Sequence, residues 1–226
     1  MKKYIYFLLF FLCFSKAYSN TEDKINFSII EMDILRNDEI IGYSNYYFEN
    51  YKNTLNVKNL TKFNIEVLGL NVFSISSEAI EIYENNKLIS FKSNTIQNKK
   101  KKFVNLKYDR NLNKYLINGS SYKGEANLNN VIGNWWNYKI LKTNSQISPL
   151  SGSIKKQKVV LLREEEIEIN NKKFKTEVFN LKSTDESLPD DKKLNFNIWI
   201  DTKQRLIVKV QYERLGIWEY RIKKFE

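Results

Sequence analysis

The sequence predicts an all-β fold: a single, strongly curled antiparallel meander sheet, shaped as a half-open barrel or a sandwich, with at most one or two short helices. Apolar and polar residues alternate over many short segments, a pattern typical of half-buried strands. Asn, Asp and Gly stand at the breaks between these segments, as they do in hairpin turns. Only two prolines and seven glycines occur in 226 residues, so no flexible linker divides the chain.

Residues 1–19 have the composition of a secretory signal. A basic start is followed by an apolar run over residues 4–14, and small residues lie at Ala17 and Ser19. The apolar run is too short to cross a bilayer, and the small residues fit the positions before a signal-peptidase cut. We therefore expect a cleaved signal peptide over residues 1–19 and one exported β domain over residues 20–226, with no transmembrane segment in the mature chain. The alternative is an uncleaved membrane anchor.

The expected strands follow one another as hairpins. In the N-terminal half, turn groups such as Asn37-Asp38 and Asn85-Asn86 separate them. Helical periodicity is weak throughout, and the best helical segment is a short one over residues 128–141. The expected strands of this part are 25–35, 39–50, 54–67, 71–83, 87–97, 102–108, 114–118, 155–163, 165–169 and 173–182.

Three more strands are expected to form a C-terminal meander. Alternation over residues 194–200 places the aliphatic residues on one face and Trp199 on the face of the asparagines. The pattern repeats over residues 206–212 and 218–223. A sheet of about ten long strands does not lie flat, because twist makes it curl or fold over. The curl gives a concave face that suits a ligand.

The residue inventory excludes several kinds of chemistry. The sequence has no histidine, and its single cysteine, Cys13, lies in the expected signal peptide. The mature domain therefore lacks disulfides, thiolate chemistry, Ser–His catalysis and the ordinary zinc site. The sequence has no Gly-rich phosphate loop either, and we expect no cofactor and no metal site.

The chain is strongly basic, with a formal net charge of +11. Such a charge attracts acidic partners and anionic lipids, so an envelope protein or an anionic membrane surface is an expected partner. Nucleic acid is not, because an exported protein meets little of it. The lysines at 99–102 lie between two expected strands and are interpreted as a solvated turn, and the acidic run at 164–166 as a solvated hairpin edge.

Carboxylates are the remaining candidates for catalysis. Glu78, Glu81 and Asp201 could in principle supply the acid pair of a glycosidase. Asp201, however, is expected to open a turn and to cap it with its own side chain. Glu78 and Glu81 are expected to face water from one strand. We assign no catalytic residue.

Aromatic residues are the more informative candidates for binding. Trp199 occupies a face expected to be polar, and Trp135 and Trp136 lie in the least regular segment. A tryptophan in a concave face offers apolar surface and one N–H donor, which suits a lipid tail or a ring. The alternative is that these rings pack in the core. The ligand-binding candidates are Trp135, Trp136, Trp199 and Tyr83, and the polar candidates are Glu81 and Asp201.

Short motifs spread along the chain resemble a family of exported bacterial proteins. They are the segment over residues 27–42 with its Ile40-Ile41-Gly42, Glu81 and Tyr83 before Asn86-Lys87-Leu88, Ser93-Asn94-Thr95, Trp135-Trp136-Asn137, and Trp199-Ile200-Asp201 ahead of Leu206. The resemblance is to domain of unknown function 6134, with a distant similarity to domain of unknown function 3108. It implies an exported, mostly-β domain in the periplasm of a Gram-negative bacterium, and no known activity. Tyr83 stands where the family more often has Trp, and residues 99–102 lack the glycine expected in that turn.

Three functions are compatible with these observations. The first is a non-enzymatic, periplasmic binding or carrier-like domain for an apolar or amphiphilic, lipid-like ligand. The second is a cell-envelope interaction protein that docks a protein or membrane partner through its basic surface and has no ligand cavity. The third is a carboxylate-based hydrolase, for which no further residue converges on the acids.

Overall fold

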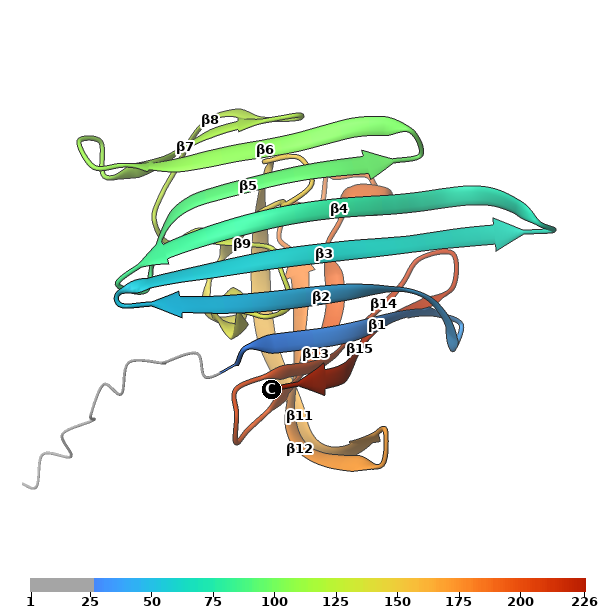
Figure 1. The fold of residues 1–226 in the computed structure, drawn as a ribbon. Coiled ribbons are helices and arrows are strands. Elements are labelled where there is room, and N and C mark those ends of the chain that lie inside the picture. Colours follow the sequence, from blue (N-terminus) through green and yellow to red (C-terminus); the bar gives the residue numbers. More distant parts are fainter. Residues whose placement is uncertain (1–26) are drawn as a thin grey trace, which may run out of the picture.

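The computed structural model describes residues 27–226, so the expected signal peptide lies outside the described residues (Figure 1). The described part contains strands and two short 3-10 helices, and no α-helix. The predicted all-β class is thus confirmed. No helix within residues 27–226 has the length and apolar character that crossing a membrane requires.

The N-terminal half consists of eight strands in hairpin succession. They are β1 (Ile29–Arg36), β2 (Glu39–Tyr51), β3 (Thr54–Val67), β4 (Leu70–Glu84), β5 (Lys87–Gln97), β6 (Lys100–Asp109), β7 (Lys114–Gly119) and β8 (Lys123–Ala126).

The C-terminal half contains the remaining strands and both 3-10 helices. They are β9 (Val131–Ile132), η1 (Tyr138–Lys142), β10 (Ser145–Ile147), β11 (Ile154–Ile169), β12 (Lys172–Ser183), η2 (Asp190–Lys192), β13 (Asn195–Asp201), β14 (Ile207–Glu213) and β15 (Ile217–Phe225).

All strands belong to one sheet in the order β8-β7-β6-β5-β4-β3-β2-β1-β15-β14-β13-β12-β11-β10-β9. Neighbours are antiparallel except β9 and β10, which run parallel. The first and last strands pair in the middle of the sheet, with Ile30 opposite Phe225. The ends of the sheet are β8 and β9, so within residues 27–226 it is not closed into a barrel. In Figure 1, strands β11 to β13 run at a steep angle to β1–β6 and pass behind them.

Asparagine explains why the hairpins are so tight. Both residues of several two-residue loops have positive φ, including Asn85 (49°) with Asn86 (62°) and Asn98 (47°) with Lys99 (69°). Such loops match the twist of the flanking strands, and asparagine tolerates this conformation better than most residues. Lys99 therefore stands where glycine is favoured in such a turn, and the lysines at 100–102 lie in β6 rather than in the turn.

Two other expectations were wrong. The segments over 155–163 and 165–169 form one strand, β11, with a register shift between Leu161 and Arg163. This bulge breaks the alternation that a continuous strand would show. The segment over residues 128–141 is not a helix: it contains β9, an irregular stretch and the start of η1. The short strands β8, β9 and β10 were not predicted.

The core joins the two halves of the sheet. One apolar cluster includes Met32 of β1, Val57 of β3, Val178 of β12 and Val208 of β14, each fully buried. Residues 127–153, which we call the crossing segment, connect β8 to β11. Its Ile132 and Ile147 pack in a second cluster with apolar residues of β4–β8. The crossing segment therefore lies against the inner face of the N-terminal strands.

Candidate binding site

A row of hydroxyl groups crosses the inner face of four neighbouring strands. Ser44 of β2 lies opposite Thr61 of β3, Thr61 lies opposite Ser77 of β4, and Ser77 lies opposite Thr95 of β5. Hydrogen bonds link Ser44 to Thr61 over 2.8 Å and Ser77 to Thr95 over 2.7 Å. Because alternate residues of a strand share a face, this row is a polar band between apolar ones.

Glu81 of β4 lies on the same inner face, between Val57 and Phe91 of the adjacent strands. Its side chain is buried, with the residue 2% exposed. Its Oε1 accepts hydrogen bonds from Asn134 Nδ2 (2.7 Å) and Trp136 Nε1 (3.0 Å). Its Oε2 accepts one from the Tyr83 hydroxyl at 2.5 Å. We call Glu81, Tyr83, Asn134 and Trp136 the Glu81 cluster.

Burial raises the pKa of Glu81 from its ordinary 4.5 to about 7. Removal from water disfavours the charged form, and this effect outweighs the hydrogen bonds from Tyr83, Trp136 and Asn134, which favour the carboxylate. The same burial raises the pKa of Tyr83 well above its ordinary value. Near neutral pH the cluster therefore holds a carboxyl group close to its point of half-ionisation.

The crossing segment supplies Asn134 and Trp136 of the Glu81 cluster and is fixed to the sheet by polar contacts. The backbone N–H of Trp135 donates to the Tyr46 hydroxyl at 3.2 Å, and Ser93 Oγ donates to the Pro149 carbonyl at 2.5 Å. At Gly133 a Cβ atom would lie 2.0 Å from Gln146 Oε1, so a larger residue would have to displace the Gln146 amide, which donates to Gln157 Oε1 at 2.6 Å. The segment thus holds Asn134 and Trp136 over β4.

An inner cavity of about 240 Å³, partly open to solvent, lies between the sheet and the crossing segment. Its polar side is formed by Glu81 and by Ser44, Thr61 and Ser77 of the hydroxyl row. Its volume is slightly below the range of about 300–1,000 Å³ common for small-molecule sites. Its apolar side includes Ala79, Phe91, Trp135, Phe196 and Tyr220.

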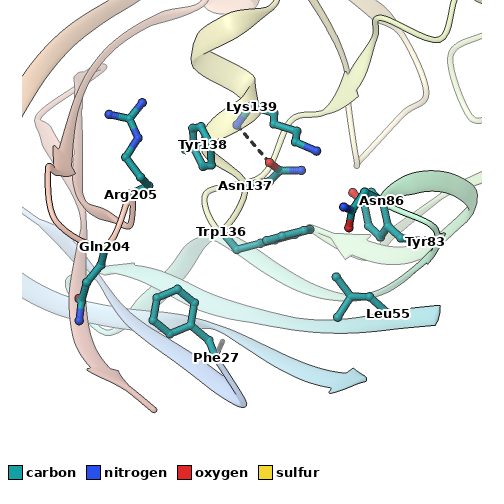
Figure 2. Close-up of a pocket in the computed structure, with 10 residues that line it drawn as sticks. All are labelled: Phe27, Leu55, Tyr83, Asn86, Trp136, Asn137, Tyr138, Lys139, Gln204 and Arg205. Carbon is teal, nitrogen blue, oxygen red and sulfur yellow. Dashed lines mark hydrogen bonds between the residues drawn. The ribbon is translucent and has the colours of Figure 1, made fainter. Parts of the chain in front are cut away.

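A smaller side pocket of about 130 Å³ lies on the other side of the Glu81 cluster (Figure 2). Trp136 occupies its centre, Tyr83 and Leu55 lie beside the indole, and Lys139 and Arg205 lie at its edge. The Tyr83 and Trp136 rings meet edge to face, with centroids 5.7 Å apart. The Glu81 cluster is thus the partition between the inner cavity and the side pocket.

The structure brings together most of the residues singled out in the sequence. Glu81, Tyr83 and Trp136 contact one another, and Trp135 lines the inner cavity, where its ring packs against Phe196 (5.1 Å) and Tyr220 (5.9 Å). The expectation that Glu81 faces water is wrong. The remaining candidates, Trp199 and Asp201, line neither cavity.

Trp199 packs in the core between the two halves of the sheet. It is 5% exposed, and its Nε1 donates to Glu165 Oε1 at 2.5 Å. Glu165 is half-buried, whereas its neighbours in the acidic run are exposed as expected. Asp201 caps its turn as predicted, since Oδ2 accepts the backbone N–H of Gln204 at 2.8 Å. Both residues stabilise the fold away from the cavity.

The three carboxylates proposed for hydrolysis do not converge. Glu78 lies on the outer face of β4 and pairs with Lys58 at 2.8 Å, because a separation of three residues puts Glu78 and Glu81 on opposite faces of a strand. Asp201 is committed to its turn. Within residues 27–226, no group of three or more His, Cys, Asp or Glu side chains could hold a metal ion.

Sequence reasoning missed several residues of the site. Tyr46, Asn134 and the hydroxyl row were not predicted, although Ser93 and Thr95 belonged to one motif of the family resemblance. A useful signal is the regular spacing of small hydroxyl residues at matching positions of successive hairpin strands. Cross-strand register, which decides which of them meet, is not visible in a local pattern.

Comparison with known proteins supports the fold and the family. The solved structure of a β-barrel-like protein of domain of unknown function DUF1849 from Brucella abortus is similar, with a TM-score of 0.58 and 9% sequence identity over 88% of this chain and 96% of that chain. At this identity the likeness concerns the fold alone. No curated protein matches the chain. The family described as Domain of unknown function (DUF6134) matches residues 32–223, and the chain therefore belongs to the DUF6134 family.

Proposed function

We propose that this domain is a non-enzymatic binding or carrier-like protein that holds a small amphiphilic molecule in the inner cavity. The observation that carries the proposal is the cavity itself, with hydroxyls and a buried carboxyl on one side and aromatic rings on the other. A site of this kind orients a ligand by a few polar contacts and binds it by apolar burial. The modest volume favours a compact molecule over a long lipid tail.

We further propose that the sheet is strongly curled and that the inner cavity lies on its concave face. The crossing segment contains β9, one end of the sheet, and shares a core cluster with β4–β8 at the other end, which supports a half-open barrel. We place the mature domain in the periplasm of a Gram-negative bacterium, after removal of residues 1–19. This part rests on the composition of the leader.

Native mass spectrometry of the protein purified from its own cell envelope tests the proposal. We expect an adduct of small-molecule mass on the wild-type protein. Ala79→Leu, which fills the inner cavity, should lose the adduct, whereas Ser76→Leu, on the outer face of the same strand, should keep it. A bare wild-type protein whose melting temperature is also unaffected by small amphiphiles would contradict the proposal.

A second candidate function is docking on an anionic membrane surface through the outer face of β2–β6. Apolar side chains are exposed there, including Ile80 (42%), Ile96 (50%) and Phe103 (40%). Five lysines surround them, and one of the acids on this face, Glu78, is paired with Lys58. Lysines among exposed apolar residues suit a negatively charged lipid interface. The lysines are Lys58, Lys62, Lys92, Lys101 and Lys107.

Co-sedimentation with phosphatidylglycerol vesicles tests this second function. Wild-type protein should bind in low salt and be released at high salt. The double change Lys92→Glu and Lys107→Glu should weaken binding, whereas the matched change Lys182→Glu and Lys203→Glu, in β12 and in the turn after β13, should not. Equal binding by both double variants would contradict docking through this face.

A further inference from the structure

We infer that the ligand of the inner cavity carries a protonated amine, which pairs with the carboxylate of Glu81. The inference rests on the proposed function and names the chemical class of its ligand. Two features carry it: the neutral partners of Glu81 and the aromatic walls of the cavity.

Within the part of the chain that the structure describes, the hydrogen-bond partners of the Glu81 carboxyl are neutral. Its partners are the Asn134 amide, the Trp136 indole and the Tyr83 hydroxyl. Two of these hydrogen bonds go to Oε1 and one to Oε2, and an ionised carboxylate has about four acceptor positions. Oε2 thus keeps one free acceptor position. A buried carboxylate without a cation is costly, and a ligand ammonium group would remove that cost.

The rest of the inner cavity also suits an ammonium group. Tyr46, Phe91, Trp135 and Tyr220 line it, and aromatic faces attract cations, by about 2 kcal/mol or more where water is excluded. Ser77 of the row lies four residues from Glu81 along β4, or about 13 Å at 3.3 Å per residue, so the row can bind a polar group at the other end of the ligand but not the ammonium group itself.

The other charged and titratable groups around the cavity do not supply this cation. Lys155 of β11 lines the cavity, but its Nζ donates to the backbone carbonyl of Lys192 at 3.4 Å. Burial raises the pKa of Tyr46, Tyr83 and Tyr220 above the ordinary value, so these tyrosines are neutral near pH 7. Lys155 would instead favour an anionic ligand, and the experiment separates the two outcomes.

The test compares three probes of one shape: cyclohexylamine, cyclohexanol and cyclohexanecarboxylate. Binding is measured by isothermal titration calorimetry on the wild-type protein and on Glu81→Gln, which keeps the side-chain shape. At pH 8.5 the amine should bind the wild type about tenfold or more tightly than the alcohol, as expected for a hydrogen bond between charged groups. In Glu81→Gln this preference should disappear while the alcohol still binds.

A pH series on the wild type gives an independent answer that needs no variant. Cyclohexylamine, like lysine, stays protonated to about pH 10. If the ionised Glu81 alone binds it, the affinity for the amine should rise by up to about thirtyfold between pH 5.5 and 8.5. The affinity for cyclohexanol should stay constant.

The outcomes separate this inference from the proposed function. Equal binding of amine and alcohol, tighter binding of the carboxylate, an unchanged preference in Glu81→Gln, or an amine affinity independent of pH would each overturn the amine inference, while alcohol binding would still support a ligand cavity. Failure of all three probes to bind would count against both.

Discussion

Replacing Glu81 by Gln should remove a large part of the pH dependence of stability. The carboxyl has an ordinary pKa of 4.5 and a pKa of about 7 in the fold. The folded state therefore holds the proton more tightly than the unfolded chain does. Stabilisation from this proton is fully present below pH 4.5 and is lost as the pH rises through about 7.

The size of the effect follows from the two pKa values of Glu81. Each unit between them corresponds to 1.36 kcal/mol, so the wild type should lose about 3 kcal/mol between pH 4.5 and pH 8 that Glu81→Gln does not lose. Glutamine has the same shape and cannot ionise. Relative to wild type, the free energy of unfolding of the variant should therefore rise by about 3 kcal/mol between pH 4.5 and pH 8.

Urea unfolding at pH 4.5, 6 and 8, followed by tryptophan fluorescence, measures this difference directly. Titration of all other groups cancels when wild type and variant are compared at each pH. Glu78→Gln, on the outer face of the same strand, is the matched control. Its free energy of unfolding relative to wild type should change by less than about 1 kcal/mol over this pH range, because an exposed ion pair contributes little. The burial argument would be refuted if the difference in free energy of unfolding between wild type and Glu81→Gln stayed constant within about 0.5 kcal/mol across the three pH values.

Three further substitutions test the site and its frame. Trp136→Phe removes one hydrogen-bond donor to Glu81 and should lower the free energy of unfolding by about 1–2 kcal/mol at pH 8. The loss should be smaller at pH 4.5, where the carboxyl is protonated, and urea unfolding at both pH values checks this. Gln157→Leu should lower the free energy of unfolding by about 2–4 kcal/mol, because Gln157 is 2% exposed and donates to two backbone carbonyls of the crossing segment. A loss below about 0.5 kcal/mol would show that the segment does not depend on this contact. Lys99→Gly should stabilise the protein by about 1 kcal/mol, since glycine has no penalty at positive φ, and a lower melting temperature would contradict the assigned turn.

The strands were largely predictable because their hairpins are local. Alternation and the turn residues, most of them including an asparagine, defined β2, β3 and β5 to within a residue or two. The prediction failed at β11, where a bulge interrupts the alternation, and at the short strands of the crossing segment. Those strands depend on contacts with distant residues, which a local pattern does not contain.

The residue types of the candidate site were predictable from the sequence, but the face of the sheet on which each side chain lies was not. In β4, Ile80 and Ile82 alternate with Glu81, and a pattern argument would place the isoleucines inside. The structure does the opposite: Ile80 is 42% exposed and Glu81 is 2% exposed. Long-range partners decide this, because Asn134 and Trp136 satisfy the carboxyl from a segment more than fifty residues away.

The pairing of β1 with β15 has a consequence for how the chain folds. Residue 30 meets residue 225, so the central seam of the sheet closes only after almost the entire polypeptide is available. Contacts so distant in sequence slow folding, because loop closure precedes the energetic gain. Until then, both strands present open edges to other chains. A circular permutant that joins the ends and opens at an outer hairpin would make this seam local, and it should refold faster.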